Sequence, residues 1–263
     1  MEYTLLSVER SFQDRVATVT MRRPEVHNAF NEQLIEELRA AFTALRDDER
    51  LHAVVLTGAG ASFSAGADIK MMQQAAGLSR EENVTEALRL ADLFETIYTF
   101  PCPVVARVNG TAMGGGLGLI AACDLVIAVE TARFAFSEVR LGIAPAVIAP
   151  YVVRKIGEGQ ARALFVTGEQ FSAARARELG LVHGVVTAQE LDAAVEQVLH
   201  HLLRGGPRAL RACKALALQV GSLSREAARD YTANLIAELR TSAEGQEGLR
   251  AFLEKRQANW VSN

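Results

Sequence analysis

Several features are scarce or missing in this 263-residue sequence, and each absence narrows the function. Only three cysteines occur, Cys102, Cys123 and Cys213, and none has the CxxC spacing of a metal or redox motif. We therefore expect a reduced, cytoplasmic protein without a cysteine metal site. No block of basic residues with interleaved aromatics is present, which argues against a nucleic-acid partner.

Long apolar runs are missing as well. No stretch approaches the roughly 20 apolar residues that a membrane-spanning helix needs. The first residues, Met1-Glu2-Tyr3-Thr4, lack the basic, apolar and small-residue sections of a secretion signal. We expect no membrane partner and no targeting segment, and we find no internal repeat or low-complexity tract.

What the chain does contain is enough apolar material for a large core, since 49% of its residues are hydrophobic and its net charge is only −3. Short apolar runs ending at glycine or proline alternate with helical patterns. The predicted strands are 15–21, 53–57, 104–108, 124–129 and 134–136, and the predicted helices of this part are 31–45, 79–98 and a short one within 111–123. This alternation predicts an α/β fold with crossover connections.

The pattern becomes helical after about residue 150. Helices are predicted at 161–165, 172–179, 187–203, 207–220 and 222–252. We therefore divide the chain into a core, residues 1–195, and a helical C-terminal region, residues 196–263. No Pro/Gly/Ser linker separates the two parts, so we expect them to pack closely.

Two of the predicted helices have specific signatures. In the first, four residues recur at spacings of four and three on one face: Leu34, Leu38, Phe42 and Leu45. In the second, Ser79 to Glu82 has the pattern of a capping box. Its expected apolar side comprises Val84, Leu88, Ala91, Leu93 and Phe94.

The loop from Phe63 to Met71 (FSAGADIKM) is the first candidate functional segment. Its small residues would let a ligand approach the backbone, and N–H groups at a helix start attract anions. A flexible loop with Asp68 as helix cap explains the same residues, so both interpretations stay open.

The glycine-rich stretch from Asn109 to Gly118 (NGTAMGGGLG) is the second candidate. Its three consecutive glycines, Gly114, Gly115 and Gly116, carry an entropy cost of several times about 1 kcal/mol. An N–H that meets an oxygen atom would require them, and so would tight helix–sheet packing. The stretch matches neither a phosphate loop nor a dinucleotide fingerprint.

Glu138 is the third candidate, because it stands between an apolar run and a loop with glycine and proline. A carboxylate in such surroundings has a raised pKa and suits proton transfer near neutral pH. The alternative is a surface glutamate paired with Arg140 or Arg154.

Taken together, these segments resemble the crotonase (enoyl-CoA hydratase/isomerase) family. Their order, spacing and flanks agree over nearly the whole chain. The agreement extends to further segments: Arg23-Pro24, His27-Asn28-Ala29, Thr57-Gly58, Phe171-Ser172-Ala173 and Glu178-Leu179-Gly180-Leu181-Val182.

The resemblance implies a spiral of ββα units followed by a helical trimerisation region, and an acyl-CoA thioester as substrate. The N–H groups of Ala67 and Gly115 would form an oxyanion hole for the thioester oxygen. Glu138 would be the acid/base residue. The resemblance further implies substrate-binding positions at Ala29, Ala65, Ala67, Asp68, Ile69, Lys70 and Gly115. It implies no metal or redox cofactor, since coenzyme A is part of the substrate, and it implies a homotrimer or homohexamer.

One position departs from the family pattern. Family hydratases usually carry a second glutamate two positions after the third glycine, where this chain has Gly118. The protein could be a hydratase in which Glu138 makes both proton transfers, and its substrate could be branched, such as methylglutaconyl-CoA. It could instead be a Δ3,Δ2-enoyl-CoA isomerase in which Glu138 carries the proton between two carbons. The third alternative is a catalytically weak acyl-CoA-binding protein. Arg140 and Arg154 are candidate partners for an additional substrate carboxylate.

The remaining polar and aromatic residues are expected to play smaller parts. His27 and His183 lack partners at metal-ligand spacing, and Cys123 lies in an apolar run. Asp124 is expected to cap or pair, and Tyr151 to pack. Three C-terminal residues are candidates to reach the coenzyme A of a neighbouring subunit: Phe252, Lys255 and Trp260.

Overall fold

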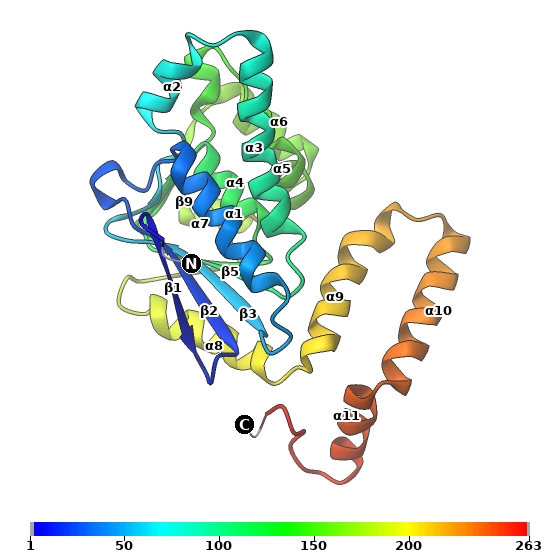
Figure 1. Cartoon of the computed structure of the whole chain (residues 1–263). Helices are drawn as coiled ribbons and strands as arrows, with labels where there is room; N and C mark the ends of the chain where they lie inside the picture. Colours follow the sequence, from blue (N-terminus) through cyan, green and yellow to red (C-terminus); the bar gives the residue numbers. More distant parts are fainter. Residues whose placement is uncertain (1–2, 262–263) are drawn as a thin grey trace.

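Two sheets form the body of the computed structural model, which describes residues 3–261 (Figure 1). The main sheet has the order β1 (Leu6–Ser11), β2 (Val16–Met21), β3 (Ala53–Gly58), β5 (Val104–Val108), β7 (Leu125–Val129) and β10 (Gly184–Val186). The second sheet has the order β4 (Ser62–Ser64), β6 (Thr111–Met113), β8 (Arg133–Ala135) and β9 (Gln170–Ser172). Two pairs, β1–β2 and β8–β9, are antiparallel, and the other pairs are parallel. Every residue of β3 is buried, as expected for a parallel strand covered on both faces.

The chain repeats one pattern three times: a strand in the main sheet, a strand in the second sheet, then helix. The strand pairs are β3–β4, β5–β6 and β7–β8. The predicted spiral of ββα units is therefore confirmed. Because β4, β6 and β8 lie side by side, the loops that follow them meet at one edge of the second sheet.

The helices have the following bounds: α1 (Glu32–Arg46), α2 (Ile69–Ala75), α3 (Arg80–Tyr98), α4 (Gly115–Ala122), α5 (Ala149–Ile156), α6 (Glu158–Thr167), α7 (Ala173–Glu178), α8 (Leu191–Leu203), α9 (Pro207–Gln219), α10 (Arg225–Thr241) and α11 (Ala243–Leu253). Three short 3-10 segments are η1 (Pro24–Val26), η2 (Ser137–Leu141) and η3 (Val220–Ser222). The four predicted apolar residues of α1 are all buried, and the capping box of α3 is present.

Two local predictions are corrected by the structure. Val84 and Leu88 do not lie on a buried side of α3, because they are 45% and 58% exposed; the buried residues of this helix lie in its C-terminal half. The short helix predicted within 111–123 is confirmed as α4, and strand β6 precedes it. The single helix predicted for 222–252 is interrupted at Ser242, whose hydroxyl accepts a hydrogen bond from the Gly245 N–H (3.0 Å) and caps α11.

Helices α9 to α11 form an arm that extends from the body (Figure 1). Helix α8 crosses the predicted division after residue 195 and buries apolar residues on both sides of that point. The arm is attached through α9, where Lys214 pairs with Asp124 at 2.6 Å, and Arg211 donates to the carbonyl of Asp48 at 2.7 Å. Within residues 3–261, no helix is long and apolar enough to cross a membrane. The N-terminus was predicted to lack a secretion signal, and its first two residues, Met1 and Glu2, lie outside the described residues.

Candidate active site

The two glycine-containing loops that follow β4 and β6 lie directly against each other. A Cβ atom added to Gly66 would be 2.7 Å from the Met113 carbonyl oxygen and 3.2 Å from the Gly115 nitrogen. Gly66 also has φ +84°, a conformation that favours glycine. The sequence therefore uses glycine here because the loop must approach the start of α4 closely.

Ala67 presents an N–H group without an acceptor. On either side of it, the Gly66 N–H donates to Ser64 Oγ at 3.3 Å, and the Asp68 N–H donates to the Phe30 carbonyl at 2.8 Å. No acceptor for the Ala67 N–H lies within residues 3–261. A backbone N–H normally finds a partner, so this one is available to an incoming oxygen atom.

Gly115 presents a second such N–H from the first position of α4. That position has no acceptor within the helix, and none elsewhere in the described chain. The preceding N–H, from Gly114, is occupied by the Ala135 carbonyl at 3.0 Å. Because the N-terminus of a helix carries partial positive charge, it favours an oxygen that becomes negative.

An ion pair fixes the loop that carries Ala67. Arg23 contacts Asp68 at 2.9 Å, and the same guanidinium donates to the carbonyl of Ala29 at 2.5 Å. The other Asp68 oxygen accepts the Lys70 N–H at 3.0 Å and caps α2. The Lys70 N–H and the Arg23 guanidinium hold the pKa of Asp68 below its usual range. The predicted capping role of Asp68 is thus observed, and it holds the loop in place.

Glu138 lies against the start of the same helix. A Cβ atom added to Gly114 would be 3.1 Å from Oε1 of Glu138. Its Oε2 is buried and has no hydrogen-bond partner among the described residues, and burial raises the pKa of this carboxyl. No ion pair joins it to Arg140 or Arg154 in that part of the chain. The environment fits a proton-transfer group better than a surface ion pair.

Other predicted site residues take different positions. Ala65, Ile69 and Lys70 are exposed, with Ile69 at 71%, whereas Ala29 is buried. Arg140 packs near Gly168. The structure therefore brings the loop of Ala67, Gly115 and Glu138 together, and Ala65, Ile69 and Lys70 are exposed on the same loop and at the start of α2.

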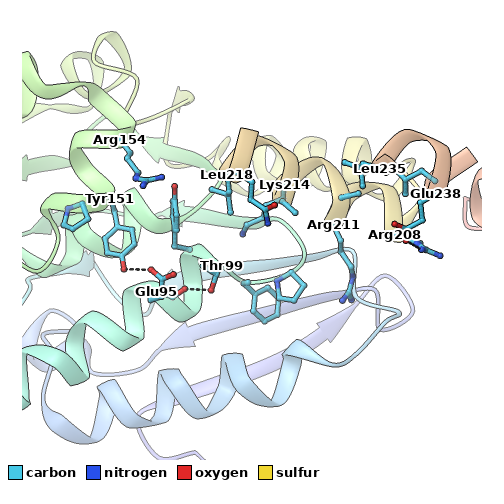
Figure 2. Close-up of a pocket in the computed structure, with 18 residues that line it drawn as sticks. Glu95, Thr99, Tyr151, Arg154, Arg208, Arg211, Lys214, Leu218, Leu235 and Glu238 are labelled. Carbon is cyan, nitrogen blue, oxygen red and sulfur yellow. Dashed lines mark hydrogen bonds and ion pairs between the residues drawn. The ribbon is translucent and has the colours of Figure 1, made fainter. Parts of the chain in front are cut away.

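Arg154 lies elsewhere, in a groove of about 730 Å³ between the body and the arm. Figure 2 shows this groove, with Tyr151 donating to Glu95 at 3.0 Å on the body side and Lys214 on the arm side. The groove is lined by α3, α5, α9 and α10, and the loops that carry the candidate site take no part in it.

The remaining candidates are structural in their contacts. His183 accepts the Val126 N–H at 3.1 Å, and Asp124 accepts the Val104 N–H at 2.7 Å besides pairing with Lys214. Burial raises the pKa of Cys123 to about 12, so this thiol is unreactive, as expected. Among the described residues, no three His, Cys, Asp or Glu side chains are arranged to hold a metal ion.

Three site-forming residues had no recognisable signal in the sequence. Phe30 lies beneath Gly115, where an added Cβ atom would be 2.7 Å from its ring. Phe94 and Ile148 cover Gly118 in the same way, at 2.8 and 2.4 Å. All three look like ordinary core residues, and only their contacts with glycines distinguish them.

Comparison with known proteins identifies the class to which this fold and these loops belong. The family model of enoyl-CoA hydratase/isomerase matches residues 11–263. A crystal structure of an enoyl-CoA hydratase from Shewanella pealeana is 38% identical, superposes with a TM-score of 0.94, and the match covers 98% of this chain and 97% of that one. The structure of Pseudomonas aeruginosa AtuE is 40% identical with a TM-score of 0.95, covering 98% and 100%.

A curated relative has similar coverage. Crotonyl-CoA hydratase from Syntrophomonas wolfei is 34% identical over 264 residues, which span 100% of both chains. The protein belongs to the enoyl-CoA hydratase/isomerase (crotonase) family. It is an enzyme of that family, and membership implies an acyl-CoA substrate.

Proposed function

We propose that the protein hydrates a 2-enoyl-CoA, with the thioester oxygen bound by the N–H groups of Ala67 and Gly115 and the protons moved by Glu138. The observation that carries the proposal is the pair of unpaired N–H groups on two loops in contact. In such a site, losing one donor to a developing oxyanion typically costs about 2.7–4 kcal/mol.

The proposed steps balance with one carboxylate. Glu138 takes a proton from water as the water oxygen bonds to Cβ, and the electrons of the double bond move onto the thioester oxygen as an enolate. The two N–H groups stabilise this negative charge. Glu138 then returns the proton to Cα, the thioester carbonyl re-forms, and the carboxylate is ready for another turnover.

Recognition of the rest of the substrate falls to the residues around these donors. We propose that Ala29, Ala65, Asp68, Ile69 and Lys70 line the coenzyme A site. The acyl group could be branched, as in methylglutaconyl-CoA, and Arg140 is the remaining candidate partner for an additional carboxylate there. Arg154 lines the groove beside the arm and is less suited to that role.

A specific observation favours a second activity. With Gly118 in place of a second acid, Glu138 could move a proton between Cα and Cγ, which would make the protein a Δ3,Δ2-enoyl-CoA isomerase. A third alternative, a weakly catalytic acyl-CoA-binding protein, rests on the same glycine.

The test uses a panel of acyl-CoA thioesters. With crotonyl-CoA, we expect the absorbance of the conjugated thioester to fall and a 3-hydroxyacyl-CoA to form. A 3-enoyl-CoA that gains conjugated absorbance without incorporating water would identify the isomerase instead. Binding of the panel without any turnover would leave only the third alternative.

We further propose that the protein assembles as a homotrimer or homohexamer and is located in the cytoplasm. The exposed apolar side chains of the arm support the homotrimer or homohexamer implied by the family. The free cysteines, two of them buried, are compatible with a reducing cytoplasm.

A further inference from the structure

Gly118 lies one helical turn beyond Gly114, the residue that precedes α4. Its N–H donates to the Gly114 carbonyl at 3.4 Å. The Glu138 carboxylate rests against Gly114, so position 118 is one turn along the helix from the place where that carboxylate lies.

Apolar side chains fill the space in front of Gly118. A Cβ atom added to Gly118 would lie 2.4 Å from Ile148 Cγ2 and 2.8 Å from two ring carbons of Phe94. Ile148 is 2% exposed and Phe94 is fully buried. Phe94 is held between Phe30 and Tyr151, with ring centroids at 6.5 and 6.0 Å. In a closely packed interior these side chains have little room to move aside.

We propose that Ile148 and Phe94 are positioning residues that exclude a second acid from the site, so that the reaction depends on the ionisation of one carboxylate, Glu138. This inference rests on the proposed function and adds to it the reason for a single proton-transferring group.

The other charged groups near Glu138 are few. Helix α4 carries no titratable side chain. On α6, which packs against η2, Glu158 and Arg162 pair with each other at the surface at 3.4 Å. Arg140 is exposed on the segment of Glu138 itself, and Asp68 on the neighbouring loop is held in its ion pair. The carboxyl of Glu138 is raised in pKa by its burial, with no contribution from a second carboxylate.

The first test is the pH dependence of kcat/KM for a 2-enoyl-CoA. One required carboxylate predicts a tenfold rise per pH unit at low pH and then a plateau. A site that needs one ionised and one protonated carboxylate gives a bell-shaped profile instead. A bell-shaped profile in the parent enzyme would overturn the inference while leaving the proposed hydration intact. Failure to turn over any enoyl-CoA would overturn the proposed function and the inference with it.

The second test rebuilds the excluded acid. Gly118→Glu alone should yield little folded protein, because the new side chain would clash with Ile148 and Phe94. Gly118→Glu combined with Ile148→Gly and Phe94→Ala removes both side chains that the new residue would meet, and it should convert the plateau into a bell. The matched control, Gly118→Gln with the same two changes, has the same bulk without a titratable group and should keep the plateau. A Gly118→Glu variant as well folded as the parent would contradict the exclusion.

Discussion

At the scale of the residue, the environment of Glu138 determines what its carboxyl can do. It lies half-buried against Gly114, and its Oε2 has no partner in the described chain. Burial without a counter-charge disfavours the ionised form, so the pKa rises above that of an exposed glutamate. A raised pKa makes the carboxylate a stronger base, and it brings the group closer to the operating pH, where acid–base catalysis is most efficient.

Replacing Glu138 by Gln should lower kcat by roughly 10²–10⁴-fold, the usual contribution of a positioned acid/base group. The amide keeps the size of the side chain, so affinity for a substrate analogue should change little. Steady-state kinetics and calorimetric binding measure the two effects. Glu169→Gln, at an exposed position, is the matched control and should behave as the parent does. Full activity in the Glu138 variant would remove this residue from the mechanism.

At the scale of the element, one ion pair joins the segment after β2 to the start of α2. Arg23 and Asp68 are only 12% and 11% exposed, and Phe30 bridges to Ala67 between them. The direction of the Ala67 N–H therefore depends on a contact formed by residues 45 positions apart in the sequence.

Asp68→Ala should destabilise the fold by about 3–5 kcal/mol, because it leaves the mostly buried Arg23 guanidinium without a counter-charge. Since the folded pKa of Asp68 lies below its ordinary 3.8, its stabilisation is present above that value and is lost as the pH falls through the folded pKa. Denaturant unfolding of parent and variant at several pH values measures both effects. The difference between them should shrink in acid; a constant difference would rule out the ion pair as its cause.

Measuring the activity of a second variant, Asp68→Asn, tests separately how Asp68 holds Ala67 in position. Asp68→Asn keeps an oxygen that can accept the Lys70 N–H, while it removes the charge that faces Arg23. We therefore expect its catalytic loss to be smaller than that of Asp68→Ala. Equal losses in both variants would indicate that the charge, rather than the helix cap, holds the loop.

At the scale of the whole molecule, the arm has more apolar surface than its own contacts cover. In the described chain, α10 has no buried residue. Exposed apolar side chains on α10 and α11 include Ile236, Leu249, Phe252 and Leu253, with Phe252 at 80% and Leu253 at 78%. Trp260, by contrast, is held against residues outside the arm: its indole N–H donates to the carbonyl of Arg204 at the end of α8 at 3.1 Å, and its own carbonyl accepts from Arg15 at 2.6 Å. An exposed apolar surface of this kind is typical of an interface between subunits.

Light scattering should therefore detect a trimer or hexamer in solution. Changing both Phe252 and Leu253 to Glu should shift the population to smaller species, because charge is costly in an apolar interface. Val166→Glu, at a position that is 68% exposed on the body, serves as the control and should not change the assembly. A monomeric parent protein would contradict the proposed assembly.

The predictions of secondary structure were confirmed where they rested on a local sequence pattern. The period of α1 and the capping box of α3 lie within a few residues of sequence, so both were recognised. The apolar side assigned to the first half of α3 was wrong, because burial depends on what packs against a helix as well as on its pattern. The short strands β4 and β9 were missed, since three residues carry little pattern until a partner from another part of the chain is known.

The sequence by itself predicted the alternation of the main strands and helices from local periodicity, and it identified the residue types of the two loops and of Glu138. The resemblance of these ordered motifs to a known family implied the ββα units. Only the tertiary structure decided that Gly66 meets Gly115, on two loops whose Ala67 and Gly115 N–H groups have no acceptor among residues 3–261. It also decided that Ile148 and Phe94 fill the space in front of Gly118, one helical turn from Gly114. These contacts join residues far apart in the sequence. They depend on close packing in the folded chain, so no local sequence pattern indicates them.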